Sequence, residues 1–329
     1  MTLIARTMLF TMIFVTLVVF YLEGIDKFPD YENYFVIAEN AGFISEGDYL
    51  FEWFSRFVLG LKTVAPETKV ELLALLNQIG CLIYFVWIAI EKKPERVFGG
   101  LLLFCLLGFM FMTTTLRASL AYLCVSAFFI RGGKFDLPGV VLLVISLAWH
   151  DSAAPVILIC LLARLGVVYL KQVMEHGVLG VSIPVALIAI SVLTVLFGES
   201  LRPALIALSD VDVGARSAYF DSDGAYGLAK MLFVLLAMAA AFGFVQDSEQ
   251  SGHAKLFSAM LCLLVSFFYL INGTVAVRFV FFVFAVTLPL RGVVAGKLEK
   301  EEIGRWATLL MAPVVFYLSI NYILINSEG

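Results

Sequence analysis

The sequence predicts an all-α protein that crosses a membrane many times, and three observations carry this prediction. Of its 329 residues, 62% are hydrophobic and only 15% are charged, whereas a soluble domain carries roughly 25% charged residues. The apolar residues form long, nearly continuous runs, and basic residues are concentrated in the short segments between them. We therefore expect a single integral membrane domain over residues 1–329.

The apolar runs set the expected helices. They cover 3–22, 70–90, 97–130, 137–163, 178–197, 228–245, 257–290 and 306–325. The runs 97–130 and 257–290 would each extend about 51 Å as one helix, whereas the hydrocarbon core is only about 30 Å thick. Each is therefore predicted to form two helices in a hairpin, and 137–163, extended to Leu170, is interpreted in the same way. The total is about 11 transmembrane helices.

Each predicted hairpin has one polar interruption near its middle. The interruptions lie at 113–117, at 150–152, and from Asn272 to Arg278. Basic residues bound the far ends of the three hairpins: Arg96, Arg131, Lys134, Arg164, Lys255 and Arg291. Because positive residues favour the cytoplasmic side, all three interruptions are expected on the outer face. The N-terminus is then cytoplasmic and the C-terminus lies outside.

Two longer loops, about 23–69 and 198–227, fall on the predicted outer side, and both are rich in acidic residues. Within the first, residues 49–59 alternate aromatic and polar groups at near-helical spacing, which predicts an amphipathic helix lying in the interface. The second contains several glycines and a proline, and we interpret it as a cover for the outer face.

Several classes of function are disfavoured by composition. A net charge of -4 argues against a nucleic-acid partner, which needs a concentrated basic face. The five cysteines lie in apolar runs without metal-ligand or disulfide spacing. Asp221 and Asp223 have the form of a DxD metal motif, but they lie in the Gly-containing loop. We expect neither a metal nor a cofactor.

Charged side chains next to apolar helix ends are the candidate functional groups. Arg117, His150 and Arg278 lie at the three interruptions, and Arg216 lies in the second outer loop. Arginine binds phosphate through a planar, bidentate guanidinium group, and histidine exchanges a proton near neutral pH. These groups together favour a phosphorylated, lipid-attached substrate. The alternative for any single arginine is that it extends to the lipid headgroups, and for His150 that it packs at a helix end.

Short motifs recur in order along the chain. Asp30, Tyr31 and Tyr34 form a D-Y-x-x-Y element after the first helix, and Glu52 begins an acidic, aromatic segment. Arg117 opens an R-x-x-x-A stretch.

Three further elements follow. His150, Asp151 and Ser152 belong to an A-x-H-x-S-A stretch, Arg216 precedes Tyr219 in the second outer loop, and Arg278 begins an aromatic helix. In order and in predicted sidedness, these elements resemble the EpsG-like, Wzy-type polysaccharide polymerases. One departure is Ala118, which stands where these proteins usually carry Gln.

The resemblance implies a fold like the GT-C-like membrane glycosyltransferases, in the bacterial cytoplasmic (inner) membrane. The donor would be an undecaprenyl-pyrophosphate-linked oligosaccharide, and the acceptor a second lipid-linked repeat unit of an O-antigen or exopolysaccharide. Arg117, Arg278 and Arg216 would hold the pyrophosphate, and His150, oriented by Asp151, would activate or position the acceptor hydroxyl. Asp30, Tyr31, Tyr34, Glu52 and Tyr219 would contact substrate. Expected partners are membrane lipid, a chain-length regulator and a flippase of the same pathway.

Three other functions remain open from sequence. A ligase would transfer the finished glycan to a lipid or protein. A flippase or transporter of a lipid-linked sugar would place charges through the bilayer midplane, with an inverted repeat. A membrane acyltransferase would need its histidine on the side of the acyl donor.

Overall fold

The structure is a computed structural model that describes residues 1–28, 31, 34–35, 64–116, 118–169, 179–197, 228–246, 250–291 and 298–327. The chain divides into two compact units. The first contains Met1–Ala153 and Leu288–Gly329, and the second contains Ala154–Thr287. Each unit is described by itself below.

The first unit is built from helices. In chain order they are α1 (Thr2–Glu23), the 3-10 turn η1 (Ile25–Lys27), α4 (Pro66–Ile90), α5 (Pro94–Leu103), the π-helical turn η2 (Phe104–Gly108), α6 (Phe109–Thr113), α7 (Ser119–Ile130), α8 (Leu137–Trp149) and α16 (Leu298–Ser327). Pro66 and Pro94 occupy first-turn positions. A backbone N–H in the first turn makes no hydrogen bond within the helix, so proline loses nothing there. Asp136 caps α8 by accepting the N–H of Gly139 at 2.9 Å.

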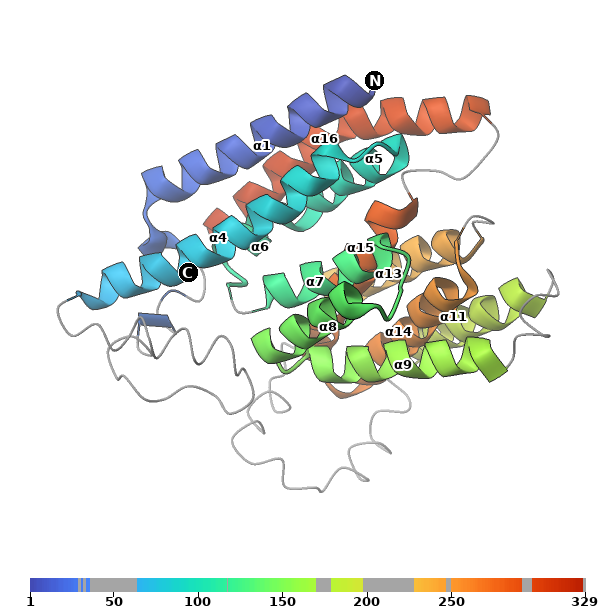
Figure 1. The fold of residues 1–329 in the computed structure, drawn as a ribbon. Coiled ribbons are helices and arrows are strands. Elements are labelled where there is room, and N and C mark those ends of the chain that lie inside the picture. Colours follow the sequence, from blue (N-terminus) through green and yellow to red (C-terminus); the bar gives the residue numbers. More distant parts are fainter. Residues whose placement is uncertain are drawn as a thin grey trace, which may run out of the picture. The chain divides into compact units, whose positions relative to one another are not determined.

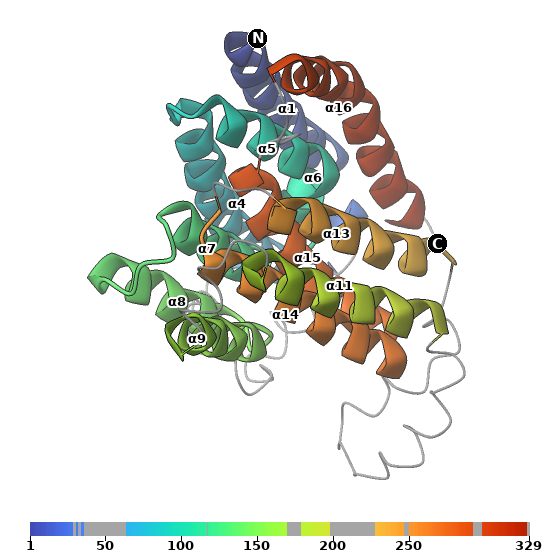
Figure 2. The same cartoon turned by 90° about the vertical axis from the view of Figure 1, so that its right-hand side faces the viewer.

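The second unit is also helical. Its helices are α9 (Ala153–Tyr169), α11 (Leu179–Phe197), α13 (Leu228–Gln246), α14 (Gly252–Ile271) and α15 (Gly273–Arg291), the last of which ends within the first unit. Figure 2 shows α11, α13 and α14 as neighbours, and each of these three helices contacts the other two. Phe268 of α14 stacks on Phe279 of α15, with ring centroids 4.6 Å apart.

Helix length and hydropathy identify the chain as a multi-pass membrane protein. Among the described residues, six helices are long and apolar enough to cross a membrane, and five shorter apolar helical segments of 10–17 residues lie in α7, α8, α9, α11 and α15. Breaks occur at all three predicted interruptions, because helices end at Thr113, Trp149 and Ile271 and new ones begin at Ser119, Ala153 and Gly273. The third is shorter than predicted, because only Asn272 separates the two helices and Arg278 lies within α15. The total of about 11 spans stays a prediction. α7 and α8 have only 12 and 13 residues, or roughly 18 and 20 Å of helix.

Close contacts between helices hold the first unit together. Figure 1 shows α1 beside α16, and the phenyl rings of Phe85 and Phe316 both pack against Phe104, the first residue of η2. A Cβ atom on Gly99 would lie 2.0 Å from the carbonyl oxygen of Leu288. Such contacts dominate in lipid, because burying apolar groups there gains little over leaving them in the hydrocarbon.

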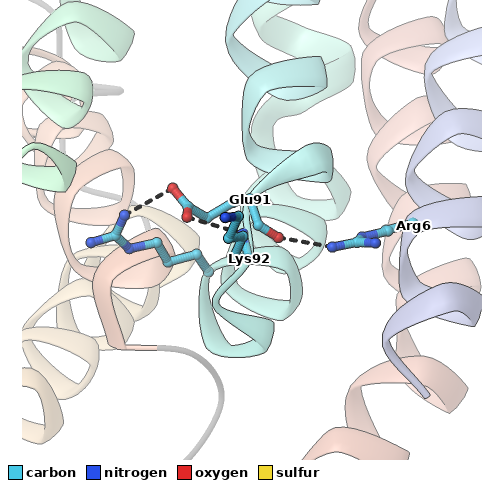
Figure 3. Close-up of polar contacts among 4 residues, drawn as sticks. Arg6, Glu91 and Lys92 are labelled. Carbon is cyan, nitrogen blue, oxygen red and sulfur yellow. Dashed lines mark hydrogen bonds and ion pairs between the residues drawn. The ribbon is translucent and has the colours of Figure 1, made fainter.

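Polar contacts collect where α1 begins, α4 ends and α5 begins, as Figure 3 shows. Arg6 donates to the backbone carbonyl of Glu91 at 2.8 Å, and Arg96 donates to the Glu91 carboxylate at 2.9 Å. A cation at the end of α4 also complements the helix dipole. Partial burial alone would raise the pKa of Glu91, but the hydrogen bonds from Arg96 and the Lys92 N–H outweigh it and lower that pKa. Arg6 and Arg96, both predicted on the cytoplasmic side, therefore lie at one end of the first unit.

Candidate functional site

The turn after α8 carries the candidate histidine. His150 follows the last helical residue in extended backbone geometry, and its N–H still bonds to the carbonyl of Ser146 at 3.2 Å. The side chain is almost completely buried, with 5% exposed. The chain turns within two residues and re-enters helix at Ala153. The imidazole is therefore fixed at a helix end, as the sequence predicted.

Two groups compete for Nδ1 of His150. Oδ1 of Asp151 lies 3.1 Å from it, and the backbone N–H of Ser152 donates to it at 3.0 Å. Nδ1 carries either a lone pair for Ser152 or a proton for Asp151, but not both. When Asp151 accepts a proton from Nδ1, the lone pair of a neutral imidazole is on Nε2. The turn is thus built to support two tautomers of one histidine.

The hydroxyl of Ser152 is a second buried polar group at this turn. Its oxygen is shielded from solvent and has no hydrogen-bond partner within the part of the chain that the structure describes. Buried polar atoms are normally paired with protein, water or ligand. Ser152 is therefore a candidate to bind a substrate hydroxyl, a role that the sequence alone did not suggest.

The break between α6 and α7 has unusual backbone bonding. The N–H groups of Thr114 and Thr115 both donate to the carbonyl of Met110, at 2.9 and 3.0 Å, and the hydroxyls of both threonines donate to the same carbonyl. The N–H of Leu116 turns to the carbonyl of Thr114. In a regular helix the Thr115 N–H would donate to the carbonyl of Phe111, and the Leu116 N–H to that of Met112. The break therefore leaves these two carbonyls without their helical donors.

Two side-chain amides from α4 replace those donors. Nδ2 of Asn77 donates to the carbonyl of Phe111 at 2.7 Å, and Nε2 of Gln78 donates to that of Met112 at 3.3 Å. Asn77 also accepts a hydrogen bond from the hydroxyl of Ser119, the first residue of α7. Both amides are buried. The sequence analysis missed them, although two adjacent amides inside an apolar run were a signal, since polar groups at membrane depth are costly.

The hairpin of α7 and α8 brings two breaks to one end. The helices pack together and run in opposite directions, joined by a tight turn in which Gly132 and Gly133 adopt positive φ. The hydroxyl of Ser146, one turn before His150, donates to the carbonyl of Ala121 at 2.9 Å. The beginning of α7 and the end of α8 are therefore adjacent. The structure places His150 at the same end of the hairpin as the break that contains position 117.

Arg278 lies in the second turn of α15, in the other unit. Asn272 alone separates α14 from α15. Its N–H bonds to the Phe268 carbonyl at 2.7 Å, and its Oδ1 accepts the N–H of Val275 at 3.3 Å. The side chain of Arg278 is half-buried. The guanidinium is thus carried by the first turns of a helix that starts directly after a capped break.

The first outer loop is described only in part. Tyr34 is buried and Tyr31 is half-buried, with its ring centroid 5.8 Å from that of Phe35. Desolvation, followed by the negative charges of Glu67, Asp26 and Glu71, raises the pKa of Tyr31. Tyr31 thus lies in an acidic environment.

Several predicted features lie outside the described residues. They are Asp30, Glu52, Arg117, Arg216 and Tyr219, the interfacial helix over 49–59, the loop 198–227, and the DxD motif at Asp221 and Asp223.

Comparisons with known proteins add no assignment. No protein-family model, curated protein or solved structure that was compared with the chain matches it. The motif resemblance therefore remains a prediction, and the chain itself is characterised as a multi-pass, all-α membrane protein.

Proposed function

We propose that this protein is a membrane polysaccharide polymerase that joins lipid-linked oligosaccharide repeat units on the outer face of the bacterial cytoplasmic membrane. The observation that carries the proposal is the pairing of two polar helix breaks at one end of the α7–α8 hairpin. One break presents a buried histidine beside a carboxylate, and the other contains position 117, where the sequence has an arginine.

The depth of these breaks supports the same substrate class. With 12 and 13 residues, α7 and α8 rise about 18 to 20 Å from the turn that joins them. If that turn lies at the cytoplasmic surface, the breaks end roughly 10 Å short of the far edge of a 30 Å hydrocarbon core. Polar groups at this depth suit a lipid whose pyrophosphate and first sugar lie near the membrane surface.

The proposed reaction is a glycosyl transfer. The acceptor hydroxyl oxygen bonds to the anomeric carbon of the donor, while the bond from that carbon to the pyrophosphate oxygen breaks. The hydroxyl proton passes to Nε2 of His150, whose Nδ1–H is held by Asp151. Undecaprenyl pyrophosphate leaves with the bonding electron pair, and the arginines stabilise its negative charge. A pyrophosphate leaving group makes this step feasible without a metal.

Reconstitution tests this function directly. The purified full chain in proteoliposomes is mixed with lipid-linked oligosaccharide extracted from cells that lack this protein. A polymerase produces a ladder of products that differ by one repeat unit and remain lipid-linked. Transfer of a single glycan to another lipid or to a protein would instead identify a ligase. Movement of the lipid-linked sugar across the bilayer without elongation would identify a flippase.

Sidedness provides an independent prediction. Single cysteines at Thr115, Asp151 and Val275 sample the three breaks, and a cysteine at Lys134 samples the opposite end of the α7–α8 hairpin. In intact cells, an impermeant maleimide should label the first three positions above the background of the unmodified protein, and Lys134→Cys only after the membrane is opened. Labelling of the three breaks from different sides would exclude a common active site.

A further inference from the structure

The polar contacts between α4 and the α6–α7 break have a role beyond packing. We propose that Asn77 and Gln78 are positioning residues, which set the backbone before and after the α6–α7 break and thereby the pyrophosphate-binding region of the proposed polymerase. The effect on substrate binding rests on the proposed function. The placement of the break rests on hydrogen bonds that the structure describes. Arg117 itself lies outside the described residues.

Two backbone carbonyls lose their helical donors at the α6–α7 break. Backbone carbonyls in hydrocarbon must be paired, because water is absent there. The α6–α7 break diverts the N–H of Thr115 to Met110 and that of Leu116 to Thr114. Asn77 and Gln78 donate instead to the carbonyls of Phe111 and Met112, and the Phe111 carbonyl also accepts a weak hydrogen bond from Sγ of Cys81 at 3.8 Å. Without those amides, the segment would regain its pairing by continuing the helix past Thr113. The two amides thus stabilise the broken form over the continuous one.

Asn77 connects the two sides of the break. Asn77 donates to Phe111 before the break and accepts from Ser119 after it. One side chain therefore links Phe111 and Ser119, the residues on the two sides of the break. Gln78 is held in turn by the hydroxyl of Tyr21, which donates to its Oε1 at 3.4 Å. The contacts link α1, α4, α6 and α7 at this break.

Close approach of the helices makes these contacts short. A Cβ on Gly80 would lie 2.4 Å from Cδ2 of Leu120, so a larger residue there would require the Leu120 side chain to shift. The same pair of helices shares another buried hydrogen bond, between Tyr84 and Ser126 at 2.5 Å. That contact lies away from the break and provides a matched control.

The test compares Asn77→Asp with Tyr84→Phe in the full chain. Asp at 77 keeps the shape and the acceptor for Ser119 but loses the donor to Phe111. Tyr84→Phe removes one buried hydrogen bond between the same helices and leaves the break untouched. The folded fraction of both variants is measured by thermal unfolding in detergent. A third variant, Asn77→Gln, tests whether restoring an amide donor at this position restores the function.

Two readouts are used, each per folded molecule. The first is the rate at which an impermeant maleimide modifies a cysteine at Thr115, which reports the position of the break without any reaction. The second is the dissociation constant for farnesyl pyrophosphate, a short polyprenyl pyrophosphate probe. We expect Asn77→Asp to change the labelling rate and to weaken binding about 10-fold, as expected for one misplaced charge-assisted contact. Tyr84→Phe should change neither.

The outcomes separate the two proposals. An unchanged labelling rate in Asn77→Asp, or equal changes in both variants, overturns the positioning role. A changed rate in Asn77→Asp alone, with no farnesyl pyrophosphate binding by the unmodified protein, supports the control of the break and counts against the proposed function.

Discussion

Replacing Arg278 with alanine is expected to reduce polymer formation by about 100- to 1,000-fold, the loss typical of removing one group that stabilises charge in a transition state. Arg278 occupies the second turn of α15, directly after the break at Asn272. In the proposed reaction its guanidinium meets the pyrophosphate as negative charge builds on it. The measurement is the yield of polymer per folded molecule in the reconstituted assay.

Two further variants define what Arg278 supplies. Arg278→Lys keeps the positive charge but loses the bidentate geometry, so we expect it to recover only part of the activity. Lys230→Ala removes a basic residue from the first turn of α13 in the same unit, and it should retain normal elongation. Equal losses in Arg278→Ala and Lys230→Ala would mean that net charge, rather than a specific contact, sets the rate.

The second large effect is expected at His150. His150→Ala should lower the elongation rate by about 100- to 10,000-fold, the range for loss of a general base. The expectation depends on the tautomer in which Nδ1–H donates to Asp151 and Nε2 faces the acceptor. The measurement is again the initial rate of elongation, at saturating lipid-linked donor.

Asp151→Asn decides how His150 acts. The Asp151 carboxylate lies 3.1 Å from Nδ1 and accepts its proton in the tautomer that general-base catalysis requires, but an Asn side chain can donate to Nδ1 and favour a proton on Nε2. If His150 is a base, Asp151→Asn should therefore lose most of the activity that His150→Ala loses. An active Asp151→Asn enzyme would show that His150 only positions the acceptor by donating from Nε2.

Much of the helix plan was predictable from sequence. Runs of 34 apolar residues are too long for one crossing, so breaks were required, and the polar residues at 113–117, 150–152 and 272–278 marked the regions in which they fall. The structure ends helices at Thr113, Trp149 and Ile271. The histidine and its carboxylate were predictable as a pair because they are neighbours in sequence and the turn is short.

The contacts of Asn77 and Gln78 were not predictable. A side-chain amide in an apolar run signals that some partner exists, but the partners lie 34 residues away in sequence. They are backbone carbonyls, which every residue carries, so that no residue type identifies them.

The sequence by itself determined a multi-pass, all-α membrane protein with breaks at three polar interruptions, since apolar length and local polarity act along the chain. Only the tertiary structure decided that the end of α8 meets the beginning of α7, and that α4 supplies the donors which the α6–α7 break lacks. The physical reason is that these contacts depend on how close two helices approach. That distance is set by shape at positions such as Gly80 and Leu120, which hydropathy does not encode.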